Sequence, residues 1–269
     1  MRRSRKKRSK RIGVLPSLLT LGNLLCGFGA IAYASVDKYS EAGWLILIAM
    51  IFDALDGRIA RMANLTSKFG AELDSLADIV TFGVAPAVLA KVISAQHLGP
   101  RLLWPMCALY LACAALRLAR FNVETRPDPK AHMQFRGLPT PAAGGFVAAL
   151  VILGEHLTKP DCEVFGLSVP EGIFEGVVPL ILPAAMVVLG ALMVSRVAYP
   201  HLMGRVLSGR RPFMHFVEIV FVGILAAVEI RVFLAGAFIF YFLLGPVSHV
   251  ARKLRRSREE PVPSETFEH

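Results

Sequence analysis

Four aspartates lie close together in an otherwise apolar part of this chain: Asp53, Asp56, Asp74 and Asp78. The spacing is i, i+3 in the first pair and i, i+4 in the second, so on helices each pair occupies one face. Carboxylate oxygens are the usual ligands of Mg²⁺ and Mn²⁺, whereas Zn²⁺ prefers His or Cys, and no histidine lies in this stretch. Two such ions can clamp the attacking and leaving oxygens of a phosphoryl transfer. We therefore expect two helices to bring these acids together around Mg²⁺ or Mn²⁺, as two ions.

Small and basic residues accompany the acids. Gly57 and Ala60 follow Asp56 on its helix and would leave room for a ligand beside it, while Gly70 would let two helices approach closely. Arg61 could neutralise phosphate or pair with a carboxylate. Each residue alone could equally be an interfacial or packing residue, but four converging carboxylates would repel one another without metal or protons. The set as a whole therefore predicts a site.

The composition places these acids in a membrane protein. Of the 269 residues 55% are hydrophobic, above the roughly 45–50% of soluble domains, and several windows can cross a bilayer. We expect an all-α, multi-pass helical bundle in which Pro86 kinks or locally adjusts the third span. The eight expected spans are 14–34, 41–60, 70–93, 102–118, 138–157, 176–197, 213–228 and 232–250. They form one domain, 14–250, after a basic segment, 1–13, and before a basic then polar tail, 251–269, disordered from Glu259.

The net charge of +10 comes largely from two basic blocks, within residues 2–11 and 252–258. In a soluble protein such blocks would suggest nucleic acid, but next to apolar spans they favour anionic lipid headgroups and the setting of topology. We expect no nucleic-acid partner. The positive-inside rule places both termini and the aspartates on the cytoplasmic side, most simply of the cell (inner) membrane.

The acidic stretch reads D-x-x-D-G-x-x-A-R-x₈-G-x-x-x-D-x-x-x-D from Asp53 to Asp78. At every specified position it resembles the signature of the CDP-alcohol phosphatidyltransferase family. The resemblance implies a six-helix core, here followed by two more helices, and a reaction in which an alcohol attacks the lipid-linked phosphate of a CDP-lipid and releases CMP. It further implies that Asp53, Asp56 and Asp74 bind the metals and that Asp78 is both a ligand and the general base.

The same resemblance assigns Gly57, Ala60 and Arg61 to the CDP-lipid site and gives Gly70 a helix contact at that site. Asn23, in the first span, is expected either to bind the diphosphate or cytidine or to bond a neighbouring helix. A general base must reach the hydroxyl whose proton it takes, and metal must offset the diphosphate charge. The four acids meet both requirements if the helices bring them together.

Other segments are similar to members of this family that use serine as the acceptor: 16–27, 75–86, 117–122 and 135–141. This likeness implies CDP-diacylglycerol and serine as substrates. Serine carries a carboxylate, and Arg120, Asn122 and Arg136 lie on the expected cytoplasmic side, where they could bind it. The same three residues could instead set topology and contact lipid headgroups.

Several alternatives stay open at this level. Within the family the acceptor could be glycerol 3-phosphate or an inositol phosphate. From other classes, a cation transporter would use the acids inside the membrane, and a helical interaction protein would use no chemistry at all. Asp53 and Asp56 lie late in their span, and Asp74 and Asp78 lie early in theirs, which favours a site facing the membrane surface. Small-residue helix faces make a homodimer plausible.

Overall fold

The computed structural model describes residues 2–62, 67–124, 137–158, 163–164, 167–168, 173–197, 199 and 229–259. It describes the side chains of all of these except 2–15, 61, 124, 163–168, 173–175 and 250–259. The helices are α1 (Arg2–Ala34), α2 (Tyr39–Met62), α3 (Lys68–Asp78), η1 (Ile79–Val84), α4 (Ala85–Ser94), α5 (Pro100–Glu124), α6 (Thr140–Leu157), α7 (Ile173–Val194) and α10 (Ile230–Glu259). The expected all-α class is confirmed, with one addition. A short antiparallel hairpin, β1 (Glu163–Val164) and β2 (Leu167–Ser168), lies between α6 and α7 in the chain.

Six helical segments among the described residues are long and apolar enough to cross a membrane: 16–34, 68–94, 100–123, 140–157, 176–194 and 230–249. They match six of the eight expected spans. The second expected span is α2, which has 24 residues and carries three charged residues, Asp53, Asp56 and Arg58, in its second half. The seventh, 213–228, lies outside the described residues. The protein is an integral multi-pass membrane protein.

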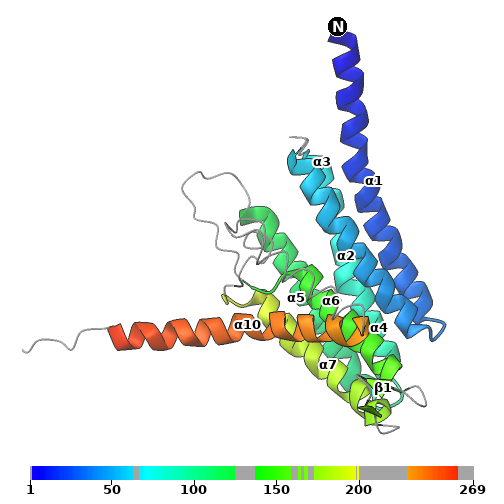
Figure 1. The fold of residues 1–269 in the computed structure, drawn as a ribbon, viewed down its shortest axis with the longest axis vertical. Coiled ribbons are helices and arrows are strands. Elements are labelled where there is room, and N and C mark those ends of the chain that lie inside the picture. Colours follow the sequence, from blue (N-terminus) through cyan, green and yellow to red (C-terminus); the bar gives the residue numbers. More distant parts are fainter. Residues whose placement is uncertain are drawn as a thin grey trace, which may run out of the picture.

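The acid-bearing helices meet at one end of the bundle. α1 and α2 are joined by a tight turn in which Asp37 adopts a positive φ of 60°. α3 begins at the N-cap Ser67, whose hydroxyl accepts from the Gly70 N–H. In Figure 1 the start of α1 and the start of α3 lie at the same end, opposite the hairpin. The carboxyl end of α2 and the first turns of α3 therefore share one edge of the bundle.

A π-helical turn, η1, follows Asp78 directly and separates α3 from α4. Pro86 has no N–H to give to the Phe82 carbonyl four residues earlier, and the hydroxyl of Tyr110 on α5 donates to that oxygen at 2.8 Å. The local adjustment expected at Pro86 is therefore confirmed, and it is a π turn. Such turns occur frequently at functional sites. Here the turn sets the orientation of α3, and so of its aspartates, relative to the buried α4.

The centre of the bundle is built where small residues let helices approach. A Cβ on Gly144 of α6 would lie 3.1 Å from the Phe82 ring, and one on Gly43 of α2 would lie 2.8 Å from Ile152. Phe82, Ile152 and Tyr110 are themselves almost completely buried. In a bilayer, where no hydrophobic force draws helices together, such close packing supplies much of the association energy. α6 is thereby held between α2 and η1.

α10 crosses α6 diagonally, and in Figure 1 it runs across the other helices. Arg231, in its first turn, lies against His156 near the end of α6, with NH1 2.9 Å from Nδ1. Farther along, Phe238 lies against Gly145, and Phe242 packs on Phe146 with ring centroids 5.3 Å apart. The basic block at the end of the chain is helical as the last turns of α10, which ends at Glu259.

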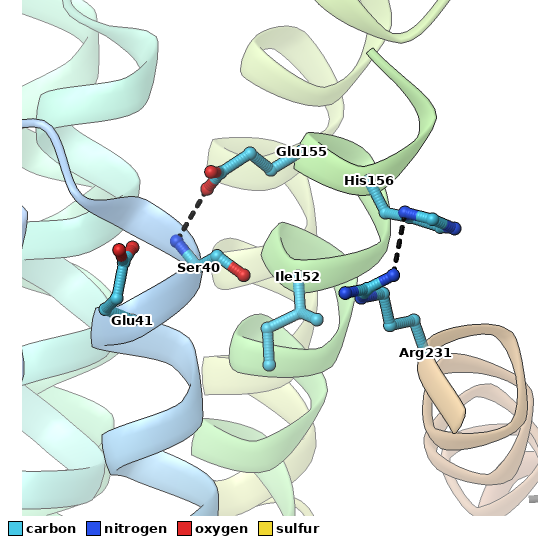
Figure 2. A pocket seen from close by; sticks show the side chains of 6 residues that line it. All are labelled: Ser40, Glu41, Ile152, Glu155, His156 and Arg231. Atoms are coloured by element: carbon cyan, nitrogen blue, oxygen red, sulfur yellow. Dashed lines mark hydrogen bonds between the residues drawn. The ribbon is translucent and has the colours of Figure 1, made fainter. Parts of the chain in front are cut away.

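A small polar pocket lies where α10 starts (Figure 2), and it is lined by Ser40, Glu41, Ile152, Glu155, His156 and Arg231. The Ser40 N–H, in the first turn of α2, donates to the Glu155 carboxylate at 2.6 Å. A carboxylate at a helix N-terminus satisfies a free N–H and complements the helix dipole. His156 Nε2 also lies 3.8 Å from Glu229. These polar groups partner one another and tie α2, α6 and α10 together at the end away from the aspartates.

Candidate active site

Three aspartates converge at the edge shared by α2 and α3. One oxygen each from Asp53, Asp56 and Asp74 lies within 4.8 Å of the other two. At an effective dielectric constant near 20, two unit charges at that distance repel by about 3 kcal/mol. Three such pairs would destabilise the fold unless a cation or protons compensate. The helices bring together exactly the kind of donor set, all carboxylate oxygen, that Mg²⁺ and Mn²⁺ prefer.

The hydrogen bonds of these acids are incomplete. Asp56 is buried, with 4% of its surface exposed, and its Oδ2 accepts from the Thr20 hydroxyl of α1 at 2.8 Å. Asp74 Oδ1 is buried and has no hydrogen-bond donor among the described residues. An unsatisfied buried carboxylate oxygen is costly. This oxygen therefore fits a metal ion, and the residues present are compatible with the divalent metal that the acidic pattern predicts.

Asp78 lies one helical turn beyond Asp74 and is 7% exposed. Its Oδ1 accepts from Asn23 Nδ2 of α1 at 3.1 Å. Asp78 also interacts electrostatically with Asp53, Asp74 and Asp56. The structure thus places all four predicted acids in one cluster, with Asp78 at its buried side. Asn23 bonds a neighbouring helix, the second of its two expected roles, and its own Oδ1 is buried with no hydrogen-bond partner in the described part of the chain.

One face of α1 forms the wall of the cluster, and it carries Thr20, Asn23 and Gly27. The Thr81 hydroxyl of η1 donates to the Asn23 carbonyl at 3.0 Å. A Cβ on Gly27 would collide with both the side chain and the backbone of Thr81. α1 can therefore lie against η1 only because residue 27 is glycine, and this approach brings Thr20 and Asn23 within reach of the acids. Thr20 was not among the predicted site residues, although its i, i+3 spacing from Asn23 was a usable signal.

The residues expected to line the CDP-lipid site are only partly described. Gly57 and Ala60 are half-buried on α2 beside Asp56, and the side chain of Arg61 lies outside the described residues. The helix contact expected at Gly70 is not found: within the described part of the chain, the only neighbour of a Cβ there would be the Ser67 hydroxyl, at 3.0 Å. The physical reason is that Gly70 belongs to the first turn of α3, where its N–H forms the cap with Ser67.

The expected acceptor residues lie on and after α5. Arg120 is half-buried, Asn122 is exposed and donates to the Ser75 hydroxyl of α3 at 2.8 Å, and Arg136 lies outside the described residues. The Asn122 contact brings the end of α5 to the residue next to Asp74.

Arg117, one turn before Arg120 on α5, is a site residue that the sequence reasoning missed. Its guanidinium donates to the Thr140 hydroxyl at the start of α6 and interacts electrostatically with Asp78 and Asp53. Its Nε is buried and has no hydrogen-bond partner among the described residues. An arginine inside an apolar span is costly and normally faces a polar cavity, and that cost was the signal available in the sequence.

Comparison with known proteins places this site in a family. The family model for CDP-alcohol phosphatidyltransferase matches residues 13–192, which include all four aspartates, Asn23 and Arg117. A Helicobacter pylori protein named CDP-diacylglycerol–serine O-phosphatidyltransferase is 38% identical over 191 residues, 70% of this chain and 72% of the relative.

Similar proteins from two other organisms carry the same name. The Bacillus subtilis protein is 35% identical over 188 residues, 70% of this chain and 90% of its own. The Saccharomyces cerevisiae protein is 42% identical over 139 residues, 50% of this chain and 47% of its own. Because the family model spans more than half of the chain and its acids form one cluster, the chain belongs to the CDP-alcohol phosphatidyltransferase family.

Proposed function

We propose that this protein is a divalent-metal-dependent enzyme that transfers the phosphatidyl group of CDP-diacylglycerol to the hydroxyl of L-serine, forming phosphatidylserine and CMP. The observation that carries the proposal is the cluster of Asp53, Asp56 and Asp74 oxygens within 4.8 Å of one another, inside the region that matches the family. The names of the Helicobacter pylori and Bacillus subtilis relatives support serine as the acceptor.

The four aspartates would hold the metal, as one or two Mg²⁺ or Mn²⁺ ions. Asp53, Asp56 and Asp74 supply three oxygens, and Asp78 borders them from the buried side. The Thr20 hydroxyl orients Asp56 by its hydrogen bond, as outer partners of metal ligands do. Bound metal would offset the negative charge of the diphosphate and of the departing CMP.

Asp78 is suited to the proton transfer. As the hydroxyl oxygen of serine forms its bond to the phosphatidyl phosphorus, the bond from that phosphorus to the oxygen of CMP breaks and the hydroxyl proton passes to Asp78. The Asn23 amide holds one Asp78 oxygen at 3.1 Å, which fixes the direction of the carboxylate and leaves the other oxygen for the proton. Such a positioned base typically contributes 10²–10⁴-fold to the rate.

The CDP moiety would lie along the face of α2 that carries Gly57 and Ala60. Both are half-buried, and neither has a long side chain that would block a nucleotide beside Asp56. Arg61 follows on the same helix and would pair with phosphate. Asn23 Oδ1, which has no partner among the residues that the structure describes, can accept from the ligand. Anionic lipids of the cytoplasmic leaflet of the cell membrane would contact the basic ends of the chain.

An acceptor screen that measures CMP tests the proposal. Purified protein with CDP-diacylglycerol and Mn²⁺ should release CMP and form phosphatidylserine when L-serine is added, and EDTA should abolish the release. Product with glycerol 3-phosphate or inositol phosphate, and none with serine, would keep the family and reject the acceptor. Metal flux into liposomes without CMP release would instead favour a cation transporter.

The variant Asp78→Asn separates an enzyme from a scaffold in the same assay. It should lose at least about 100-fold in kcat, because the amide cannot take the proton. Its melting temperature should be unchanged or higher, since one of four mutually repelling charges is gone. Full activity in Asp78→Asn would contradict the assignment of the base.

A further inference from the structure

The pocket at the start of α10 (Figure 2) lies at the end of the bundle away from the aspartates and has no part in the proposed reaction. Its volume is about 160 Å³, enough for several water molecules or a small polar group. Charged side chains from three helices line it, namely Glu41 of α2, Glu155 of α6 and Arg231 of α10. The pocket therefore offers both signs of charge to one ligand.

Arg231 supplies the positive charge. Its guanidinium is half-buried, and NH1 lies 2.9 Å from Nδ1 of His156. Because arginine can only donate, this nitrogen must accept, and the imidazole is then neutral with its proton on Nε2. Within the described residues no carboxylate forms an ion pair with Arg231. The described partner of this cation is thus neutral, and the remaining N–H groups of the fork suit an anion such as phosphate.

The two glutamates supply the negative charge. Glu155 accepts from the Ser40 N–H at 2.6 Å, and this bond uses one of its two oxygens. Glu41 is exposed and makes no hydrogen bond or ion pair within the described part of the chain. In Figure 2 Ile152 lies between these two carboxylates and Arg231. Opposite charges are therefore held apart across an apolar side chain rather than paired with each other.

The pocket lies at the level of the lipid headgroups. α2 begins at Tyr39, α6 ends at Leu157 and α10 begins at Ile230, so three helices start or end around it. Both α6 and α10 are long and apolar enough to cross the membrane, which places these ends at its surface. Tyr39 and Trp44 lie near the start of α2, and such aromatic residues are typical of the membrane interface.

We propose that this pocket binds the headgroup of a zwitterionic phospholipid with a primary ammonium, such as phosphatidylethanolamine. The phosphate would lie at Arg231, the ammonium between Glu41 and Glu155, and the two-carbon link over Ile152. Both contacts are charge-assisted hydrogen bonds, the stronger class. An anionic headgroup without an ammonium would leave the two carboxylates uncompensated and bring further negative charge near them, so it would be rejected. This inference does not rest on the proposed function.

A purely structural role for the pocket makes a different prediction. In that case its polar groups serve only to tie α2, α6 and α10 together through the Ser40–Glu155 and His156–Arg231 contacts. Glu41 takes no part in either contact. Neutralising Glu41 would then leave lipid binding unchanged, whereas the headgroup site requires its charge.

The experiment uses the full chain in detergent micelles. Native mass spectrometry measures the apparent Kd of the first bound lipid while phosphatidylethanolamine or phosphatidylglycerol, with the same acyl chains, is added. The wild type should bind phosphatidylethanolamine at least about tenfold more tightly. Glu41→Gln should weaken phosphatidylethanolamine binding about tenfold, as expected for the loss of one charge-assisted bond, and should not weaken phosphatidylglycerol binding. Its melting temperature without lipid should equal that of the wild type.

Glu72→Gln is the matched control, because Glu72 is an exposed glutamate on α3, away from this pocket, and its loss should leave both affinities unchanged. Arg231→Gln should weaken phosphatidylethanolamine binding at least as much as Glu41→Gln does. Soluble O-phosphoethanolamine should not displace the lipid at equal concentration; displacement would assign the pocket to a soluble ligand and overturn the lipid as its occupant. Equal affinity of the wild type for the two lipids, or unchanged phosphatidylethanolamine binding in Glu41→Gln, would also overturn the proposal.

Discussion

At the scale of single residues, two polar side chains of α1 hold members of the acidic cluster in place without being metal ligands themselves. Thr20 donates to Asp56 and Asn23 donates to Asp78, so each half of the cluster has one acid held by a neighbouring helix. A carboxylate held in one orientation loses less conformational freedom when it binds a cation. The two contacts therefore belong to the function of the acids as much as to the packing of α1.

Thr20→Val tests this role, because valine keeps the shape of threonine and loses only the hydroxyl. We expect the Mn²⁺ concentration for half-maximal activity to rise about tenfold, while kcat at saturating Mn²⁺ is nearly retained. The measurement is a Mn²⁺ titration of CMP release. Thr20→Ser keeps the donor and should behave like the wild type. An unchanged Mn²⁺ requirement in Thr20→Val would show that the Asp56 contact is only structural.

The sequence could predict the acids but not all of their partners. Asp53, Asp56, Asp74 and Asp78 are spaced so that helix geometry alone places them on two faces, and the signature then pairs those faces. Arg117 has no such spacing pattern, because its hydrogen-bond partner, Thr140, lies on another helix, 23 residues farther along the chain. A contact of that kind depends on how the helices cross, which no local spacing records.

At the scale of elements, the close approach of α1 to η1 positions Thr20 and Asn23, the two residues that donate to Asp56 and Asp78. Gly27 lies against Thr81, and the π turn presents Thr81 so that its hydroxyl reaches the Asn23 carbonyl. Without the glycine, α1 would have to move away from η1. Helix packing and site geometry are therefore coupled through one residue.

Gly27→Ala measures that coupling. The new Cβ would meet the Thr81 backbone, which cannot yield cheaply, so we expect a loss of about 1–3 kcal/mol in stability. Activity should fall at least tenfold, because the Asn23–Asp78 contact opens. Melting temperature and CMP release measure the two effects. Gly236→Ala on α10, where a Cβ meets nothing within 4 Å, is the control and should be neutral or slightly stabilising. Wild-type behaviour in Gly27→Ala would contradict the tight approach.

The elements themselves were predictable to different degrees. The spans could be located because long apolar windows are visible in the sequence. A local adjustment near Pro86 could be predicted because proline lacks the N–H that a helix requires. The form of that adjustment was not predictable, because a π turn depends on Tyr110 of another helix to bond the Phe82 carbonyl. The diagonal course of α10 likewise follows from contacts with Gly145 and His156 rather than from its own sequence.

At the scale of the whole molecule, the two ends of the bundle differ in how their charged side chains are arranged. At one end the acids of α2 and α3 gather under α1. At the other end Glu155, His156 and Arg231 pair with groups of neighbouring helices. Among the described residues, the three-carboxylate group that could hold a cation lies at the first end. A reaction between a water-soluble alcohol and a lipid requires this asymmetry, because the site must open to one aqueous side at membrane depth.

The distribution of basic residues predicts how the two ends of the bundle are oriented across the membrane. Both termini and the acidic end should face the cytoplasm, and the α1–α2 turn should face the opposite side. Two exposed lysines provide a matched pair, Lys38 in that turn and Lys68 at the start of α3. Each is replaced by cysteine in a chain whose four native cysteines are changed to alanine. In intact spheroplasts a membrane-impermeant maleimide should label Lys38→Cys, and Lys68→Cys should be labelled only after permeabilisation. The opposite pattern would place the acids outside the cell, away from any cytoplasmic supply of CDP-lipid and serine, and would contradict the proposed reaction as well as the topology.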